Sequence, residues 1–144
     1  MKDILILAIS AIAWWTYSPA PAEPQTIEVT PVDLVAEQVS WLRARGWDAR
    51  IPDEIRTVSR EEIISMTHNP GTAGACLNGV VYLGDHLTLS IPQHASVLLH
   101  ELVHIAQNGC AIPDTTRRAI FEADAYATQR EWLRDHGVKL IVFR

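Results

Sequence analysis

Apolar residues recur every three to four positions after residue 31, which predicts an amphipathic helix at the start of the folded chain. They are Leu34, Val35, Val39 and Leu42. Gly46 ends the run, as glycine often does just past a helix. Residues 55–58 then predict a short extended segment.

Capping and turn signals delimit the next two elements. Residues 59–62 read Ser-Arg-Glu-Glu, a capping box that predicts a helix over residues 60–67, and Asn-Pro-Gly at residues 69–71 ends it. β-Branched and aromatic residues between Gly79 and Gly84 predict a strand. We expect residues 85–92 to form a loop or a second short strand.

Two further helices are predicted toward the C-terminus. Pro92 suits the first turn of a helix that runs to Asn108, and Gly109 follows as its end signal. Asp114 is a good N-cap for a longer helix that continues to His136. Residues 138–143 would form a terminal strand. The pattern as a whole predicts an α+β fold with a short sheet.

The N-terminus differs from the rest of the chain. Residues 4–15 are almost all apolar, which is short for a membrane span of about 20 residues but typical of a signal-peptide core. Ala-Pro-Ala at residues 20–22 offers a cleavage pattern. We therefore expect a signal peptide over residues 1–22, a linker over 23–31 and a folded domain over 32–144. The alternative is an uncleaved membrane anchor over residues 4–17; both predict an exported protein, periplasmic or secreted.

Composition and charge limit the classes of partner. The 144 residues suggest one domain, and 48% hydrophobic residues are typical of a globular chain. The net charge is −5, and no basic cluster extends beyond Arg117 and Arg118. Nucleic-acid binding is therefore not expected, because it needs a basic face.

If the protein is exported, its two cysteines are expected to form a disulfide. Cys76 and Cys110 are the only cysteines, and they can pair in an oxidising compartment. The alternative is two buried free thiols.

Three polar residues interrupt an apolar run in the middle of the helix predicted over residues 92–108. Between residues 97 and 106 only His100, Glu101 and His104 are not apolar, and a helix that is apolar all round is buried. Two histidines four residues apart lie on one helical face and can bind one zinc ion. Glu101 lies about 100° further round the helix, where it can act as general base on a water at the metal.

A catalytic zinc needs a third protein ligand. Cys110 is one candidate, although pairing with Cys76 is the simpler explanation. The last helix offers Glu122 and Asp124, which are two residues apart and point in different directions, so that only one can face the metal. Tyr126 lies one turn beyond Glu122 and would contact a ligand or an oxyanion, or simply pack. His68, His86, His94 and His136 are expected to be solvated, with His94 and His136 the best candidates for extra site residues.

These motifs resemble the gluzincin group of zinc metallopeptidases. The resemblance covers His-Glu-Leu-Val-His-Ile-Ala-Gln at residues 100–107 and Glu-Ala-Asp-Ala-Tyr at residues 122–126. It implies that Glu122 is the third ligand, with Tyr126 where Asp or Asn usually stands. The metzincin pattern fails, because Gln107 and Cys110 occupy its Gly and His positions. The chain is also similar to small exported proteins with a Glu-x-Glu-Ala-Tyr-x-x-Gln segment, which residues 122–129 approach.

The resemblance also implies a fold and a reaction. It implies a zincin-like domain in which residues 79–83 form the edge of a peptide-binding cleft. One zinc ion on His100, His104 and Glu122 would activate a water for peptide-bond hydrolysis, with Glu101 as general base. The expected partners are peptide or protein substrates, with membrane contact only through the N-terminal segment. The alternatives are a non-catalytic zinc-binding scaffold and an envelope-binding module whose two histidines are merely buried.

Overall fold

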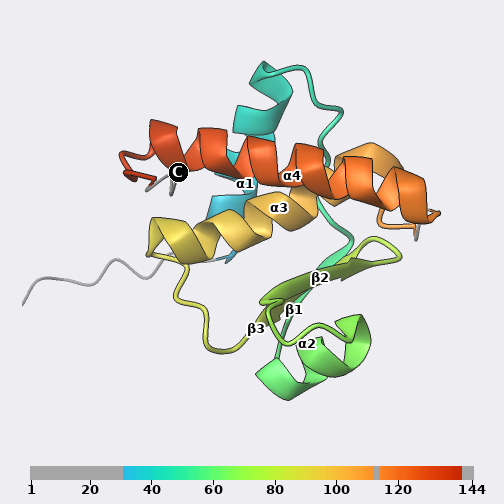
Figure 1. The fold of residues 1–144 in the computed structure, drawn as a ribbon. Helices are drawn as coiled ribbons and strands as arrows, with labels where there is room; N and C mark the ends of the chain where they lie inside the picture. The colour runs from blue at the N-terminus through green and yellow to red at the C-terminus, as the bar shows by residue number, and fades with distance from the viewer. Residues whose placement is uncertain (1–30, 112–113, 141–144) are drawn as a thin grey trace, which may run out of the picture.

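Four helices and three strands follow one another in the computed structural model, which describes residues 31–111 and 114–140. In chain order they are α1 (Pro31–Ala44), β1 (Glu54–Val58), α2 (Arg60–Thr67), β2 (Gly74–Leu77), β3 (Val80–Gly84), α3 (Pro92–Asn108) and α4 (Thr115–Asp135). The sheet lies between α2 on one side and the pair α3 and α4 on the other (Figure 1). This arrangement confirms the expected α+β fold.

The sheet has the strand order β1-β3-β2, with β3 in the centre. β1 pairs with β3 in parallel, and β2 pairs with β3 in antiparallel. Asn78 and Gly79 join β2 to β3, and both have positive φ, at 49° and 81°. A two-residue Asn-Gly connection with left-handed backbone is the favoured tight hairpin turn, because its twist matches that of the strands.

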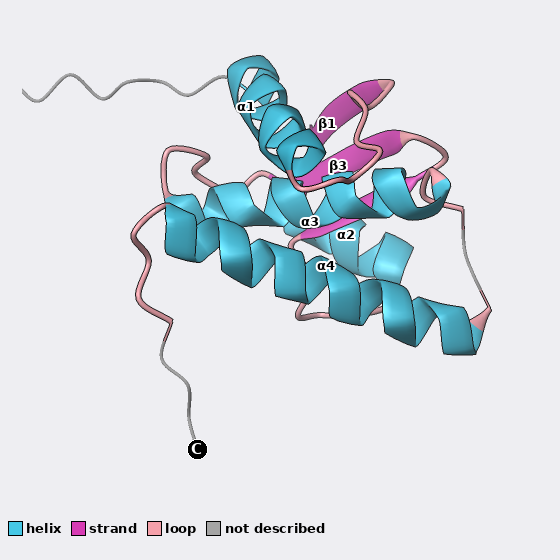
Figure 2. Cartoon of the chain, turned by 90° about the horizontal axis from the view of Figure 1, so that it is seen from above, coloured by secondary structure: helices cyan, strands magenta, loops and turns pink. Residues whose placement is uncertain are grey.

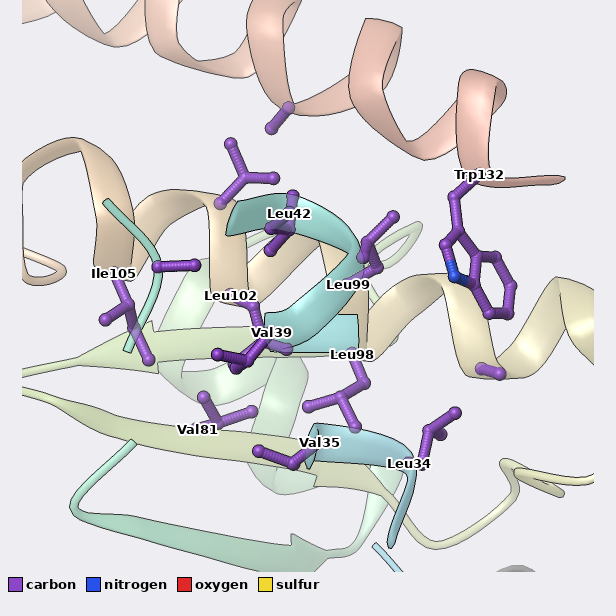
Figure 3. Close-up of a cluster of buried hydrophobic side chains, with 14 of the residues drawn as sticks. Leu34, Val35, Val39, Leu42, Val81, Leu98, Leu99, Leu102, Ile105 and Trp132 are labelled. Atoms are coloured by element: carbon purple, nitrogen blue, oxygen red, sulfur yellow. The ribbon is translucent and has the colours of Figure 1, made fainter. Parts of the chain in front are cut away.

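Helix α3 is the centre of the hydrophobic core. Its Leu98, Leu99 and Leu102 are fully buried, and it packs against the sheet, α1 and α4. Seen from above, α1 and α4 lie on different sides of α3 (Figure 2). The core side chains of these elements meet around α3 (Figure 3). An all-round buried helix is what the apolar run between residues 97 and 106 predicts.

Most predicted elements are confirmed by the structure. The capping box at Ser59 and Glu62 has both of its hydrogen bonds, and Asp114 caps α4 by accepting from the backbone of Arg117. Strand β2 was not predicted. Residues 85–91 form turns and loop rather than a strand, and residues 138–140 are not in a strand; residues 141–143 lie outside the described part of the chain.

The predicted disulfide between Cys76 and Cys110 is present, with Cα atoms 5.4 Å apart. It joins β2 to the residue that follows the C-cap of α3. The alternative of two free thiols is therefore wrong, and Cys110 is not available as a thiolate ligand.

Replacing both cysteines by serine is expected to lower the free energy of unfolding by about 4 kcal/mol, since the bond closes a loop of 34 residues and so restricts the unfolded chain. Urea unfolding of the parent and of the Cys76→Ser, Cys110→Ser variant would measure the difference. The reduced parent serves as control and should unfold with the variant. Equal midpoints for oxidised parent and variant would contradict the prediction.

The expected signal peptide and nearly all of the linker lie outside the described residues. Pro31, the last residue assigned to the linker, is the first residue of α1. Among the helices that the structure describes, none is both long and apolar enough to cross a membrane.

Candidate metal centre

His100 and His104 lie one turn apart on the inner part of α3. The residue His100 is 8% exposed, and the side chain of His104 is 16% exposed. Their rings meet edge to face, with centroids 4.8 Å apart, and their Nε2 atoms are 3.1 Å apart. The spacing of four residues on one helix thus brings two imidazole nitrogens to one point.

Glu122 reaches the same point from α4. Its Oε2 lies 3.2 Å from Nε2 of His100, and its Oε1 lies 3.3 Å from Nε2 of His104. The two helices run antiparallel beside each other (Figure 1), and Ala125 is fully buried. A small side chain here allows α4 to approach α3 closely. Asp124, the competing candidate, is exposed and does not join the group.

Only one of the small residues in this part of α4 contributes to the close approach. Of the three alanines at positions 123, 125 and 127, only Ala125 is buried, while Ala123 and Ala127 are exposed. Residues two apart on a helix point in different directions, so the three cannot share one interface.

The second ring nitrogens of the two histidines contact amide side chains. His100 Nδ1 lies 3.2 Å from Oε1 of Gln129, and His104 Nδ1 lies 2.8 Å from Oε1 of Gln107. Sequence reasoning missed both contacts. The signal that was available is helical spacing, because Gln107 is three residues after His104 and Gln129 is seven after Glu122, on the faces that meet between α3 and α4.

Glu101 is buried beside this group and has no hydrogen-bond partner within the described residues. It is 6% exposed and lies against β2, where a Cβ added to Gly74 would be 3.1 Å from its Oε1 and 2.8 Å from Cγ1 of Val97. Gly74 therefore leaves room for the carboxylate. Burial raises the pKa of the Glu101 carboxyl, and the charges of His100 and His104 partly oppose this rise.

In metal-free protein at fixed neutral pH, Glu101→Gln is expected to raise the melting temperature by several degrees. A buried carboxylate without a hydrogen bond costs more to desolvate than an amide, and each kcal/mol shifts the midpoint by roughly 4–8 °C in a domain of this size. Thermal unfolding monitored by circular dichroism in the presence of a chelator would measure it. A variant that melts below the parent would show that Glu101 stabilises the fold.

The ionisable groups of the site favour positive charge next to Glu122. Hydrogen bonds with His100 and His104 lower the pKa of the Glu122 carboxyl far below its usual range. Burial lowers the pKa of His104, but its hydrogen bond with Glu122 and the charge of Glu101 outweigh burial, and the pKa is raised overall. The two shifts agree in indicating a carboxylate that neighbours a cationic group.

The spacing of the three donors fits one metal ion. Donors bound to a tetrahedral zinc ion at about 2.0–2.2 Å lie roughly 3.3–3.5 Å from one another. Here the two Nε2 atoms are 3.1 Å apart, Oε2 of Glu122 lies 3.2 Å from that of His100, and Oε1 of Glu122 lies 3.3 Å from that of His104. With one ligand atom taken from each residue, the three atoms lie within 4.8 Å of one another. Among the described residues, His100, His104 and Glu122 are the group of histidine, cysteine and acidic side chains that could hold a metal ion.

Tyr126 borders the group, whereas the other histidines do not. The Tyr126 ring meets that of His100 edge to face at 4.6 Å and is 53% exposed as a residue. His94 accepts a hydrogen bond from the backbone of Thr88, and His136 bonds to Glu37 of α1. Neither of these two histidines, the best candidates for extra site residues, joins the group of His100, His104 and Glu122.

The strand beside the site is β2 rather than the strand expected from residues 79–83. Residues 80–83 fall in β3, which is paired on both sides by β1 and β2, and Gly79 lies in the turn before it. A strand with both edges occupied cannot form a cleft edge. β2 lies at the edge of the described sheet, and its Gly74 contacts Glu101.

The fold and the site define an α+β domain in which two helices bring together a His-His-Glu group that could hold a metal ion. The chain belongs to the family described as a domain of unknown function (DUF6647), whose model matches residues 29–143. Comparison with curated proteins gave no match, and comparison with solved structures gave none.

Proposed function

We propose that this protein is a zinc-dependent metallopeptidase of the gluzincin type, built on a minimal zincin-like domain. One observation carries the proposal: one ligand atom from each of His100, His104 and Glu122 lies within 4.8 Å of the others, and Glu101, the residue after His100, is buried beside them without a hydrogen bond. A purely structural metal site would have no need of that carboxylate, which is costly to bury.

The donor set favours zinc among divalent ions. Two imidazoles and one carboxylate are the protein ligands of many catalytic zinc sites, which keep a fourth position open for water or substrate. When bound, such an ion lowers the pKa of a water toward 7 and polarises a carbonyl. Other divalent ions that accept nitrogen and oxygen donors are alternatives that metal analysis would distinguish.

The role proposed for Glu101 follows from its surroundings. Its carboxylate has no hydrogen-bond partner among the described residues, so it is free to accept a proton from a water and pass it to a leaving amine. Its raised pKa favours this exchange, because a base that holds its proton more tightly than an exposed glutamate accepts it more readily.

The free edge of β2 is the proposed docking place for substrate. An extended peptide could add to this edge as a further strand, which would place its backbone next to Gly74 and Glu101. Strand addition recognises backbone groups, so the proposed substrates are peptides or extended protein segments. Export to an oxidising compartment is proposed with it, and the Cys76–Cys110 disulfide is consistent with such a location.

Metal analysis combined with a peptidase assay would test the proposal. Protein purified at neutral pH without added zinc should contain about one zinc per chain, and a chelator should remove both the metal and the hydrolysis of a mixed peptide library, with zinc restoring both. Protein without metal would favour a histidine pair that is merely buried. Protein with zinc but no hydrolysis would favour the non-catalytic scaffold.

A further inference from the structure

We infer that Gln107 and Gln129 are positioning residues that fix the tautomers of His104 and His100, so that both Nε2 lone pairs face the candidate metal position. The inference rests on the proposed metal site but not on peptidase activity. It follows from the hydrogen bonds that each amide makes on its far side, because those bonds determine which end of the amide faces the histidine.

The backbone of α4 orients Gln107. The amide Nε2 donates to the carbonyl oxygen of Phe121 at 2.9 Å, and a carbonyl can only accept. The Oε1 atom of Gln107 must therefore be the end that faces His104, at 2.8 Å from Nδ1. Since an amide oxygen can only accept, Nδ1 of His104 carries a proton, and in the neutral ring its Nε2 is left with a lone pair.

A serine relay orients Gln129 in the same way. The Ser96 hydroxyl donates to the carbonyl oxygen of Gln93 at 2.7 Å, so its oxygen is left to accept from Nε2 of Gln129 at 2.8 Å. The Oε1 atom of Gln129 consequently faces Nδ1 of His100, which must donate to it. Ser96 is a polar residue that is only 1% exposed, and its role in orienting Gln129 explains why a hydroxyl is buried there.

The two relays start from different backbone carbonyls and reach the same result. In neutral rings they leave two Nε2 lone pairs 3.1 Å apart beside the Glu122 carboxylate, an arrangement that requires a cation there: a metal ion, or in metal-free protein a proton that Nε2 donates to Glu122. Neutral amides do this without adding a further negative charge. A carboxylate in either place would hold the ring more strongly but would reduce the net positive charge of a bound divalent ion.

Methionine variants of similar length test the inference, since methionine removes the acceptor and keeps the bulk. Gln107→Met and Gln129→Met should each weaken zinc binding by about 10- to 100-fold, measured by competition with a chromophoric chelator and zinc alone as the probe. The matched control is Gln38→Met. Gln38 is a fully buried glutamine of α1 whose Nε2 donates to the backbone of Ala95, away from Glu122, so its loss should leave zinc affinity within about twofold.

Nitrogen-15 NMR of metal-free protein shows which ring nitrogen of each histidine carries a proton. This property would not change if the two glutamines only filled space. In the parent, both histidines should carry a proton on Nδ1. Gln107→Met should give His104 a mixture of tautomers and leave His100 unchanged, and Gln129→Met should do the reverse. Gln129→Glu keeps the acceptor that faces Nδ1 of His100, and the Ser96 hydroxyl can turn from Gln93 to donate to the second carboxylate oxygen, so the variant should preserve the parent tautomer.

Unchanged tautomers and affinities within twofold of the parent in both methionine variants would overturn the inference. If a methionine variant does not fold, the glutamate variant decides: a His100 tautomer mixture in folded Gln129→Glu would count against the relay. Zinc binding without hydrolysis would contradict the proposed peptidase while leaving the tautomer result intact, so the two failures are distinguishable.

Discussion

Replacing Glu101 with glutamine is expected to lower kcat for peptide hydrolysis by about 100- to 10,000-fold, the range that general acid–base catalysis contributes. Glutamine has nearly the same shape, so it fits beside Gly74, but it cannot accept a proton. Since Glu101 is not among the three donors that converge, zinc content should stay near one per chain. Steady-state kinetics on a fluorogenic peptide, together with metal analysis, would measure both quantities.

Two comparisons make the Glu101 result decisive. Glu61→Gln, an exposed residue in the first turn of α2, changes charge equally and should leave kcat unaltered. The melting temperature of Glu101→Gln shows separately that the variant is folded. A parent and a variant that hydrolyse peptides at the same rate would exclude Glu101 as the base, and two equally inert proteins that bind zinc would support the scaffold alternative.

Replacing Glu122 with glutamine is expected to weaken zinc binding by more than about 100-fold, beyond the effect of losing a partner outside the metal's own ligands. Glutamine keeps the length of the side chain and removes the charge that lies within 3.3 Å of both histidines. Hydrolysis should fall with zinc occupancy and recover in part at high zinc concentration. Competition titration with a chelator of known affinity would measure the loss.

Asp124→Asn is the matched control for Glu122. It removes a carboxylate two residues along the same helix, from a residue that is exposed and does not join the group of His100, His104 and Glu122. Zinc affinity should remain that of the parent. Equal losses in the two variants would indicate a general electrostatic effect of α4, and a loss confined to Asp124→Asn would assign the third ligand to Asp124 instead.

The helices and the donor residues could be predicted because their signals are local. Pro92 and Gly109 delimit α3, the apolar run between them predicts burial, and the spacing of His100 and His104 places both rings on one face. Glu122 needed one assumption beyond this, that α4 returns antiparallel along α3. A short connection between two helices makes that return the usual outcome.

The rest of the site depends on tertiary register, which one sequence does not contain. β2 is only four residues long, and its place at the sheet edge results from pairing with β3 through the turn at Asn78 and Gly79. The Asn-Gly pair was a usable hairpin signal. The hydrogen bond between Gln107 and Phe121, by contrast, depends on the axial register of α4 along α3. An error of one helical turn would break it, and only the packing of the two helices determines that register.

The disulfide encloses most of the proposed chemistry in a covalent ring. Residues 76–110 contain all of α3, and with it His100, Glu101 and His104, and they also contain the exposed residues Asp85 and His86 of a surface loop. Exposed loops are the usual sites of proteolytic nicking. One cut anywhere within the ring leaves the two fragments joined, so the molecule stays covalently whole after a first nick and can come apart only when its disulfide is reduced.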